Sequence, residues 1–164
     1  MTTYFDCQLS DAAGAHVQKE QFNQLYLEDL STGMEEWVEH TFSQSDVDLF
    51  ASLSGDISPV HINKDFAGSS IYKRNVVHGI LVSALFSNLI GTKLPGAYAI
   101  YESQTLQFRK PVYPGDNIKA VCQIESINYY QMRVIITCRA WNGSSIVVDG
   151  QARVLVPSNN GNRY

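Results

Sequence analysis

The chain has few charged residues for its length and no excess of positive charge. Asp, Glu, Lys and Arg make up 17% of the 164 residues, and the formal net charge is −4 at pH 7. A nucleic-acid-binding surface needs clustered positive charge, so this composition argues against a nucleic-acid partner. A small cationic pocket for a phosphorylated ligand is still compatible with it, and Lys73, Arg74, Arg109 and Lys110 are candidates for such a contact.

Cysteine is also scarce, and its positions follow no metal-ligand spacing. The three cysteines are Cys7, Cys122 and Cys138, of which the last two lie inside strand-like runs and are expected to be small core hydrophobes. The N-terminus lacks the basic, apolar and small-residue regions of a signal peptide. We therefore expect a cytoplasmic protein.

No apolar run is long enough to cross a membrane. The longest, from Gly79 to about Gly91, would reach about 20 Å as a helix, against about 30 Å for a bilayer core. Apart from its terminal glycines, only Ser83, Ser87 and Asn88 are polar in it. A helix that is apolar on nearly every side is a core helix in a globular protein, so we expect it to be buried and expect no membrane partner.

Regular alternation of apolar and polar residues predicts strands on both sides of this helix. The expected strands are Glu35–Phe42, Tyr98–Arg109, Ile118–Ile124, Gln131–Trp141 and Ile146–Val156. The dipeptide Asn142-Gly143 indicates a hairpin between two of them. The pattern predicts an α+β fold, in which a curved antiparallel sheet wraps around the long apolar helix. Such a sheet leaves one face and both ends of the apolar helix exposed to solvent. A second copy of the chain could bury them, so we expect a homodimer.

The length and composition predict one domain with loosely held ends. Residues 1–24 are polar without a sustained period, and we expect them to form a loosely ordered extension. Residues 25–157 form the predicted domain. Residues 158–164, which read SNNGNRY, form the expected C-terminal tail.

A short helix is predicted just before the stretch that contains Asp56 and His61. Apolar residues recur at helical spacing from Val47 to Leu53. Ser43 and Ser45 both precede this pattern, and Ser45 is the expected N-cap because Asp46 and Asp48 then fall in the first turn. Gly55 is placed to end the helix. Asp56 then follows on a loop. Pro59 breaks any helical continuation and is expected to place His61 on the same loop.

Asp56 and His61 could act together as an acid and a base on one water molecule. The N–H of Gly79, at the positive end of the apolar helix, could bind a carbonyl oxygen, and Ser87 lies two turns further along. Each residue also has a simpler interpretation: a turn aspartate, a structural histidine, and a serine bonded to a main-chain carbonyl. We expect His78 to be structural. No third ligand stands at a usual spacing for a metal site.

The order of these residues resembles the MaoC-like hydratases, and in particular the (R)-specific enoyl-CoA hydratases of the hot-dog fold. The resemblance rests on Leu-Ser-Gly-Asp56-x-x-Pro59-x-His61, followed by Val77-His78-Gly79 at the start of an apolar helix. It continues through Leu94-Pro95-Gly96, Phe108 to Pro111 and Pro114-Gly115-Asp116, and covers about residues 25 to 157. The sequence departs from the family at Ser58, where Asn is common.

The resemblance implies a single hot-dog fold and an enzyme that adds water reversibly to 2-enoyl thioesters to give (R)-3-hydroxyacyl thioesters. Asp56 and His61 match the catalytic pair. Gly79 matches the residue whose N–H holds the thioester carbonyl, and Ser87 matches a serine that supports the site. The implied partner is an acyl-CoA or acyl-carrier-protein thioester, with neither a cofactor nor a metal.

Two other functions are compatible with the same residues. A hot-dog thioesterase would use a carboxylate to activate water against the thioester carbonyl, and it would release free thiol. A non-catalytic acyl-thioester binding subunit would keep the fold without turnover, and Ser58 is the only residue that favours it.

Overall fold

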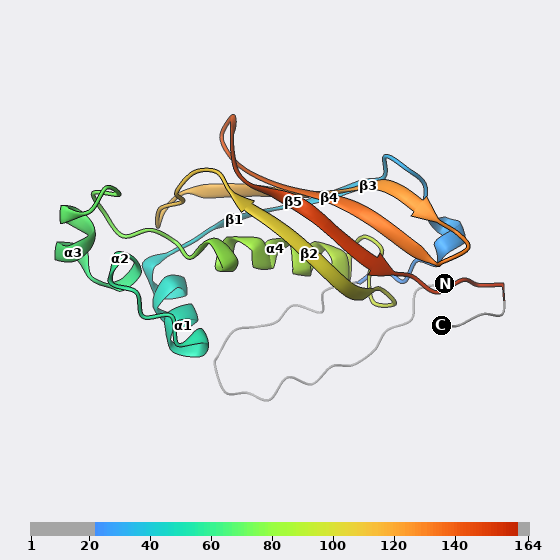
Figure 1. The fold of residues 1–164 in the computed structure, drawn as a ribbon, viewed down its shortest axis with the longest axis horizontal. Coiled ribbons are helices and arrows are strands. Elements are labelled where there is room, and N and C mark those ends of the chain that lie inside the picture. Colours follow the sequence, from blue (N-terminus) through green and yellow to red (C-terminus); the bar gives the residue numbers. More distant parts are fainter. Residues whose placement is uncertain (1–21, 161–164) are drawn as a thin grey trace.

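The computed structural model describes residues 22–160, which form a five-stranded antiparallel sheet curved over one long helix (Figure 1). The elements are η1 Leu27–Asp29, β1 Glu35–Thr41, α1 Gln44–Ser54, α2 Pro59–Ile62, α3 Lys64–Ser69, α4 Gly79–Thr92, β2 Ile100–Phe108, β3 Asn117–Asn128, β4 Arg133–Asn142 and β5 Ser145–Leu155. This arrangement confirms the predicted α+β class.

The sheet has the strand order β1-β3-β4-β5-β2, and every pair is antiparallel. The alternation of β4 places Val134, Ile136, Cys138 and Ala140 in the core, all fully buried, while Arg139 is exposed on the other face. The hairpin between β4 and β5 turns at Gly143, whose φ of 57° is easily adopted by glycine. The strand and hairpin predictions are therefore confirmed.

Helix α4 lies across the inner face of the sheet and supplies much of the core (Figure 1). Val82, Phe86 and Leu89 are fully buried, and burying each side chain of this size contributes about 1.5–3 kcal/mol. The helix is not covered on every side, because Ser87 is exposed and Ile80 is 57% exposed within the single chain. None of the helices in residues 22–160 is both long and apolar enough to span a membrane.

The contacts of the domain reach slightly beyond the boundaries expected at residues 25 and 157. The Asn23 N–H donates to the carbonyl of Thr92 at 2.7 Å, close to the end of α4. At the other end, the Asn159 N–H donates to the Glu28 carboxylate at 2.9 Å. Residues 1–21 of the expected extension and 161–164 of the expected tail lie outside the described residues.

Helix α1 begins two residues earlier than predicted, because Ser43 and not Ser45 is its N-cap. The Ser43 hydroxyl accepts from the Asp46 N–H at 3.2 Å, and the Asp46 carboxylate accepts from the Ser43 N–H at 2.7 Å. This reciprocal pair satisfies two main-chain donors at once. Ser45 has Asp48 at the same spacing, so the local sequence offers both caps and the fold selects Ser43. The helix ends as predicted at Gly55, with a φ of 77°.

Helix α2 corrects a second prediction, because Pro59 starts a helix where a loop was expected. Pro59 is its first residue, a position where the missing N–H costs nothing and the fixed φ already suits a helix. His61 therefore lies on a helical turn, where its backbone is fixed more firmly than it would be on a loop. In Figure 1, α1, α2 and α3 gather at the end of the molecule where α4 begins.

Candidate active site

Asp56 is held at the end of α1 by the turn that follows it. Gly55 adopts the left-handed conformation, and the Asp56 carboxylate then accepts from the Ser58 N–H at 3.3 Å. The side chain of Asp56 is 54% exposed, so the remaining oxygen lone pairs are open to water or substrate. Ser58 thus supports Asp56 through its main chain.

His61 is fixed on α2 by a hydrogen bond to a distant part of the chain. Its Nδ1 lies 2.7 Å from the carbonyl oxygen of Val76, which can only accept. We therefore assign the proton to Nδ1, which leaves the Nε2 lone pair free to accept a proton. The ring lines a cavity of about 380 Å³ at the start of α4.

His78, expected from the sequence to be structural, contacts both members of the predicted pair. It is only 2% exposed, and its Nε2 donates to the main-chain carbonyl of Asp56 at 3.0 Å. Its ring stacks on that of His61, with centroids 3.7 Å apart and an interplanar angle of 25°. Its Nδ1 is buried and has no hydrogen-bond partner within residues 22–160. The only sequence signal for this role is its place directly before Gly79.

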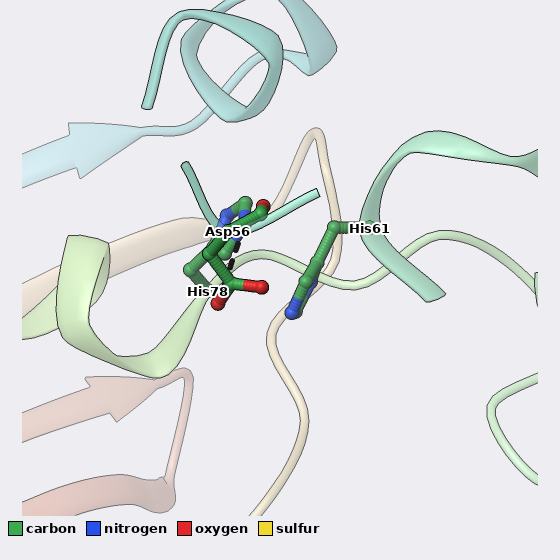
Figure 2. Close-up of side chains that lie close together, drawn as sticks. All are labelled: Asp56, His61 and His78. Carbon is green, nitrogen blue, oxygen red and sulfur yellow. Dashed lines mark hydrogen bonds and ion pairs between the residues drawn. The ribbon is translucent and has the colours of Figure 1, made fainter. Parts of the chain in front are cut away.

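Asp56, His61 and His78 form a compact cluster, in which one polar atom from each lies within 4.8 Å of the others (Figure 2). Two histidines and a carboxylate can hold a metal, but only if their lone pairs converge. The lone pairs of His61 and His78 lie in the planes of two stacked rings, and these planes are too far apart and too nearly parallel for the lone pairs to meet at one ion. The His78 Nε2 also carries the proton that it donates to Asp56. This orientation does not suit a metal ion.

Gly79 is the first residue of α4, and its N–H has no acceptor within the described residues. This donor stands at the positive end of the helix dipole and on the edge of the cavity. The Phe108 ring lies so close that a Cβ at position 79 would be 2.6 Å from it. The structure thus brings Asp56, His61 and Gly79 to one end of α4, as the sequence predicts. His61 and Gly79 line the cavity, whereas Asp56 is not among its lining residues and joins the site through the cluster with His61 and His78.

Ser87 is not among the residues that line the cavity. It is exposed and lies eight residues after Gly79, or about 12 Å along the helix axis. Ser83, one turn into the helix, instead bonds back to the Gly79 carbonyl at 2.9 Å. The single chain therefore does not bring Ser87 together with the other predicted site residues.

The walls of the cavity are mostly apolar. They include Val76, Val77, Ile80, Val82, Phe108, Val112 and Val148. Apolar walls exclude water and strengthen the hydrogen bonds formed inside them. The arrangement can therefore hold an apolar chain whose carbonyl oxygen points to Gly79, while Asp56 and His61 act on a water molecule beside it.

A curved antiparallel sheet around one long helix defines a protein of the hot-dog class, and here an Asp–His pair lies beside the start of that helix. Residues 29–140 match the family described as MaoC like domain. The chain is 38% identical to a 3-hydroxybutyryl-CoA dehydratase of Methylorubrum extorquens, over 81% of this chain and 85% of that protein. It is 35% identical to an (R)-specific enoyl-CoA hydratase of Rhodospirillum rubrum, over 81% and 92% of the two chains.

A solved structure shares the fold over most of this chain. The (R)-hydratase from A. caviae, described as involved in PHA biosynthesis, superposes with a TM-score of 0.77 at 34% identity. The similarity covers 79% of this chain and 99% of that one. The chain belongs to the MaoC-like dehydratase family.

Proposed function

We propose that this protein is a hydro-lyase that adds water reversibly to trans-2-enoyl thioesters and forms (R)-3-hydroxyacyl thioesters. The observation that carries the proposal is the meeting of three groups at one end of α4. These are the free Nε2 of His61, the exposed carboxylate of Asp56 and the unpaired N–H of Gly79. The family membership and the names of the two relatives support the same reaction.

In this mechanism a water molecule is held between Asp56 and His61. The His61 Nε2 accepts one proton from the water as the water oxygen bonds to C3 of the substrate, while Asp56 accepts a hydrogen bond from the other hydrogen. The electron pair of the C2–C3 double bond moves toward the thioester oxygen, where the Gly79 N–H stabilises the enolate charge. C2 then takes the proton from His61, which restores the enzyme. Dehydration is the reverse sequence.

Gly79 and Ser87 are the proposed substrate contacts. Gly79 is supported by its unpaired N–H on the edge of the cavity. Ser87 is supported by its match to the family serine, since it does not line the cavity. If Ser87→Ala leaves kcat/KM unchanged for enoyl thioesters of short and long chain, Ser87 does not belong to the site.

The test is the hydration of crotonyl-CoA, followed as the loss of enoyl absorbance. The wild-type protein should turn it over, and Asp56→Asn should lower kcat by about 10²–10⁴-fold while the protein remains folded. Asp65→Asn, an exposed carboxylate on the neighbouring helix α3, is the matched control and should stay close to wild type. Undiminished activity of Asp56→Asn would contradict the proposal. Release of free thiol from saturated butyryl-CoA would instead identify a thioesterase.

We also propose that the protein is a homodimer. Strand β2 is at an edge of the sheet, and it exposes Ile100, Tyr101 and Phe108 by 47%, 37% and 53%. An exposed edge strand with large apolar side chains can pair with a second chain. Light scattering should give twice the mass of one chain, and Ile100→Lys should shift it toward the monomer. A wild-type protein that is monomeric at micromolar concentration would contradict this proposal.

A further inference from the structure

The four cations that the sequence offers for phosphate contact fall into two groups in the structure. Arg109 is bound to Asp149, with Nε–Oδ1 at 2.8 Å and Nη2–Oδ2 at 3.3 Å, and this hydrogen bonding lowers the pKa of Asp149. Lys110 donates to the Ser145 hydroxyl at 2.9 Å. These two side chains on the edge of the active-site cavity are therefore already engaged with other groups. Lys73 and Arg74 are in a different position.

Lys73 and Arg74 lie together with Lys64 around a second hollow of about 430 Å³. Gln44, Asn75 and Pro114 complete its wall. Within residues 22–160, none of the three cations forms an ion pair with a carboxylate. In a chain of net charge −4, three cations without a carboxylate partner around one hollow concentrate positive charge at one place on the surface.

The segment that carries these cations is held in place. Lys73 adopts a φ of 64°, in the left-handed region that residues other than glycine rarely occupy. The Arg74 guanidinium carbon lies 4.0 Å from the centroid of the Tyr113 ring, a cation–π contact that fixes its direction. The Tyr113 hydroxyl in turn donates to the carbonyl of Tyr72 at 3.4 Å. Lys73 and Arg74 therefore stand on a braced segment of backbone, and Lys64 stands at the start of α3.

The same segment borders the active site. Tyr72 and Val76 line the active-site cavity, and the residues between them, Lys73 to Asn75, line the second hollow. Gln44, on the wall of the second hollow, donates to the main-chain carbonyl of His61 at 3.1 Å. The second hollow and the active-site cavity are therefore neighbours, lined by alternate parts of residues 72–76.

We propose that the hollow between Lys64, Lys73 and Arg74 binds a phosphate group of the carrier to which the acyl thioester is attached. This inference rests on the proposed function, because both possible carriers, coenzyme A and the phosphopantetheine arm of acyl carrier protein, bear phosphate. Arg74 supplies a planar fork that matches a phosphate, and the two lysines add charge from other directions.

The experiment measures binding by calorimetry, without turnover, so that it stands apart from the test of the reaction. The ligands are coenzyme A, 4′-phosphopantetheine and pantetheine, which has no phosphate. Lys73→Gln/Arg74→Gln should weaken coenzyme A binding about tenfold and remove most of its dependence on salt, but leave pantetheine binding unchanged. Lys64→Gln should also weaken coenzyme A binding, and it leaves the contact between Arg74 and Tyr113 intact.

Lys119→Gln/Arg139→Gln is the matched control, because it also removes two exposed positive charges, from β3 and β4. If the hollow variants bind both coenzyme A and 4′-phosphopantetheine more weakly, the hollow binds the phosphate that the two carriers share. If only the affinity for coenzyme A falls, the hollow binds the phosphates of its nucleotide part. Equal dissociation constants for coenzyme A in wild type and both hollow variants, or an equal loss in the control, would overturn the inference. Failure of crotonyl-CoA hydration would overturn the proposed reaction and leave this binding result standing.

Discussion

His61 and His78 lie face to face, with their ring centroids 3.7 Å apart. The buried ring of His78 forms one side of the space that His61 occupies, while the Val76 carbonyl fixes the His61 Nδ1. His78 also donates to the main chain of Asp56. One buried side chain therefore sets the position of both the proposed base and the carboxylate that faces it, and His78 is a positioning residue of the proposed site.

Two substitutions should separate the two contacts of His78. His78→Phe keeps a ring against His61 but loses the donor to Asp56, whereas His78→Gln keeps a donor but loses the ring. Because a displacement of about 1 Å can cost about 10²-fold in rate, we expect each to lower kcat by tenfold or more with little change in KM. Steady-state kinetics with crotonyl-CoA measures kcat and KM separately.

The control for these variants is their thermal stability. His78→Ala, which loses both contacts, should have the lowest kcat of the three even when assayed well below its melting temperature. If all three variants melt earlier but keep the wild-type kcat, His78 has a structural role only.

Gly79→Ala should impair the site because of the Phe108 ring. The new methyl would lie 2.6 Å from that ring, so either the ring or the start of α4 must move. We expect kcat/KM to fall about tenfold or more, although the N–H is retained. Phe108→Leu in the same chain should recover part of this loss.

Gly91→Ala is the matched control for Gly79→Ala, because a Cβ at position 91 on the same helix meets nothing within 4 Å. It should keep full activity and gain about 0.4–1 kcal/mol of stability. If Gly79→Ala is as active as Gly91→Ala, the close contact with Phe108 does not matter for the reaction.

Ser58→Asn, which restores the residue common in the family, should change kcat by less than about threefold. Asp56 is held by the N–H of residue 58, and the Ser58 hydroxyl caps no helix donor in α2. Ser58→Ala should be equally mild for the same reason. A large gain in rate for Ser58→Asn would show that the side chain at this position limits the enzyme.

Ser43→Ala should lower the free energy of unfolding by about 1 kcal/mol, because it removes the N-cap of α1. Ser45→Ala, two residues later on the exposed side of the same turn, should change it by less than about 0.5 kcal/mol. Chemical denaturation at neutral pH measures both. Equal effects would mean that the cap is not at Ser43.

The effect of Ser43→Ala should also depend on pH. The hydrogen bonds from the main chain and hydroxyl of Ser43 lower the pKa of Asp46 below its ordinary value. A carboxylate with a lowered folded-state pKa stabilises the fold above its unfolded pKa of about 4, and this contribution is lost as the pH falls through the folded-state pKa. The difference between wild type and Ser43→Ala should therefore shrink in acid. It should not vanish, because the Ser43 hydroxyl still accepts from the Asp46 N–H.

The sequence by itself determined the framework of this protein. The apolar run of α4 and the alternation in β3, β4 and β5 are strong signals. Residues close together in the chain determine which face of a helix or strand is apolar and will be buried. The motif from Asp56 to Gly79 also predicted which groups meet at the start of α4. Local signals failed where two serines or a proline offered alternative helix starts, as at Ser43 and Pro59.

Only the tertiary structure decided what surrounds these groups. His78 meets Asp56 and His61 across 22 and 17 residues of sequence, and no periodicity encodes that contact. Asp149 reaches Arg109 from another strand, whereas no carboxylate within residues 22–160 pairs with Lys73 or Arg74. Folding also places Ser87 on an exposed side of α4. Contacts of this kind depend on how the sheet curves over the helix, which is a property of the packed chain as a whole.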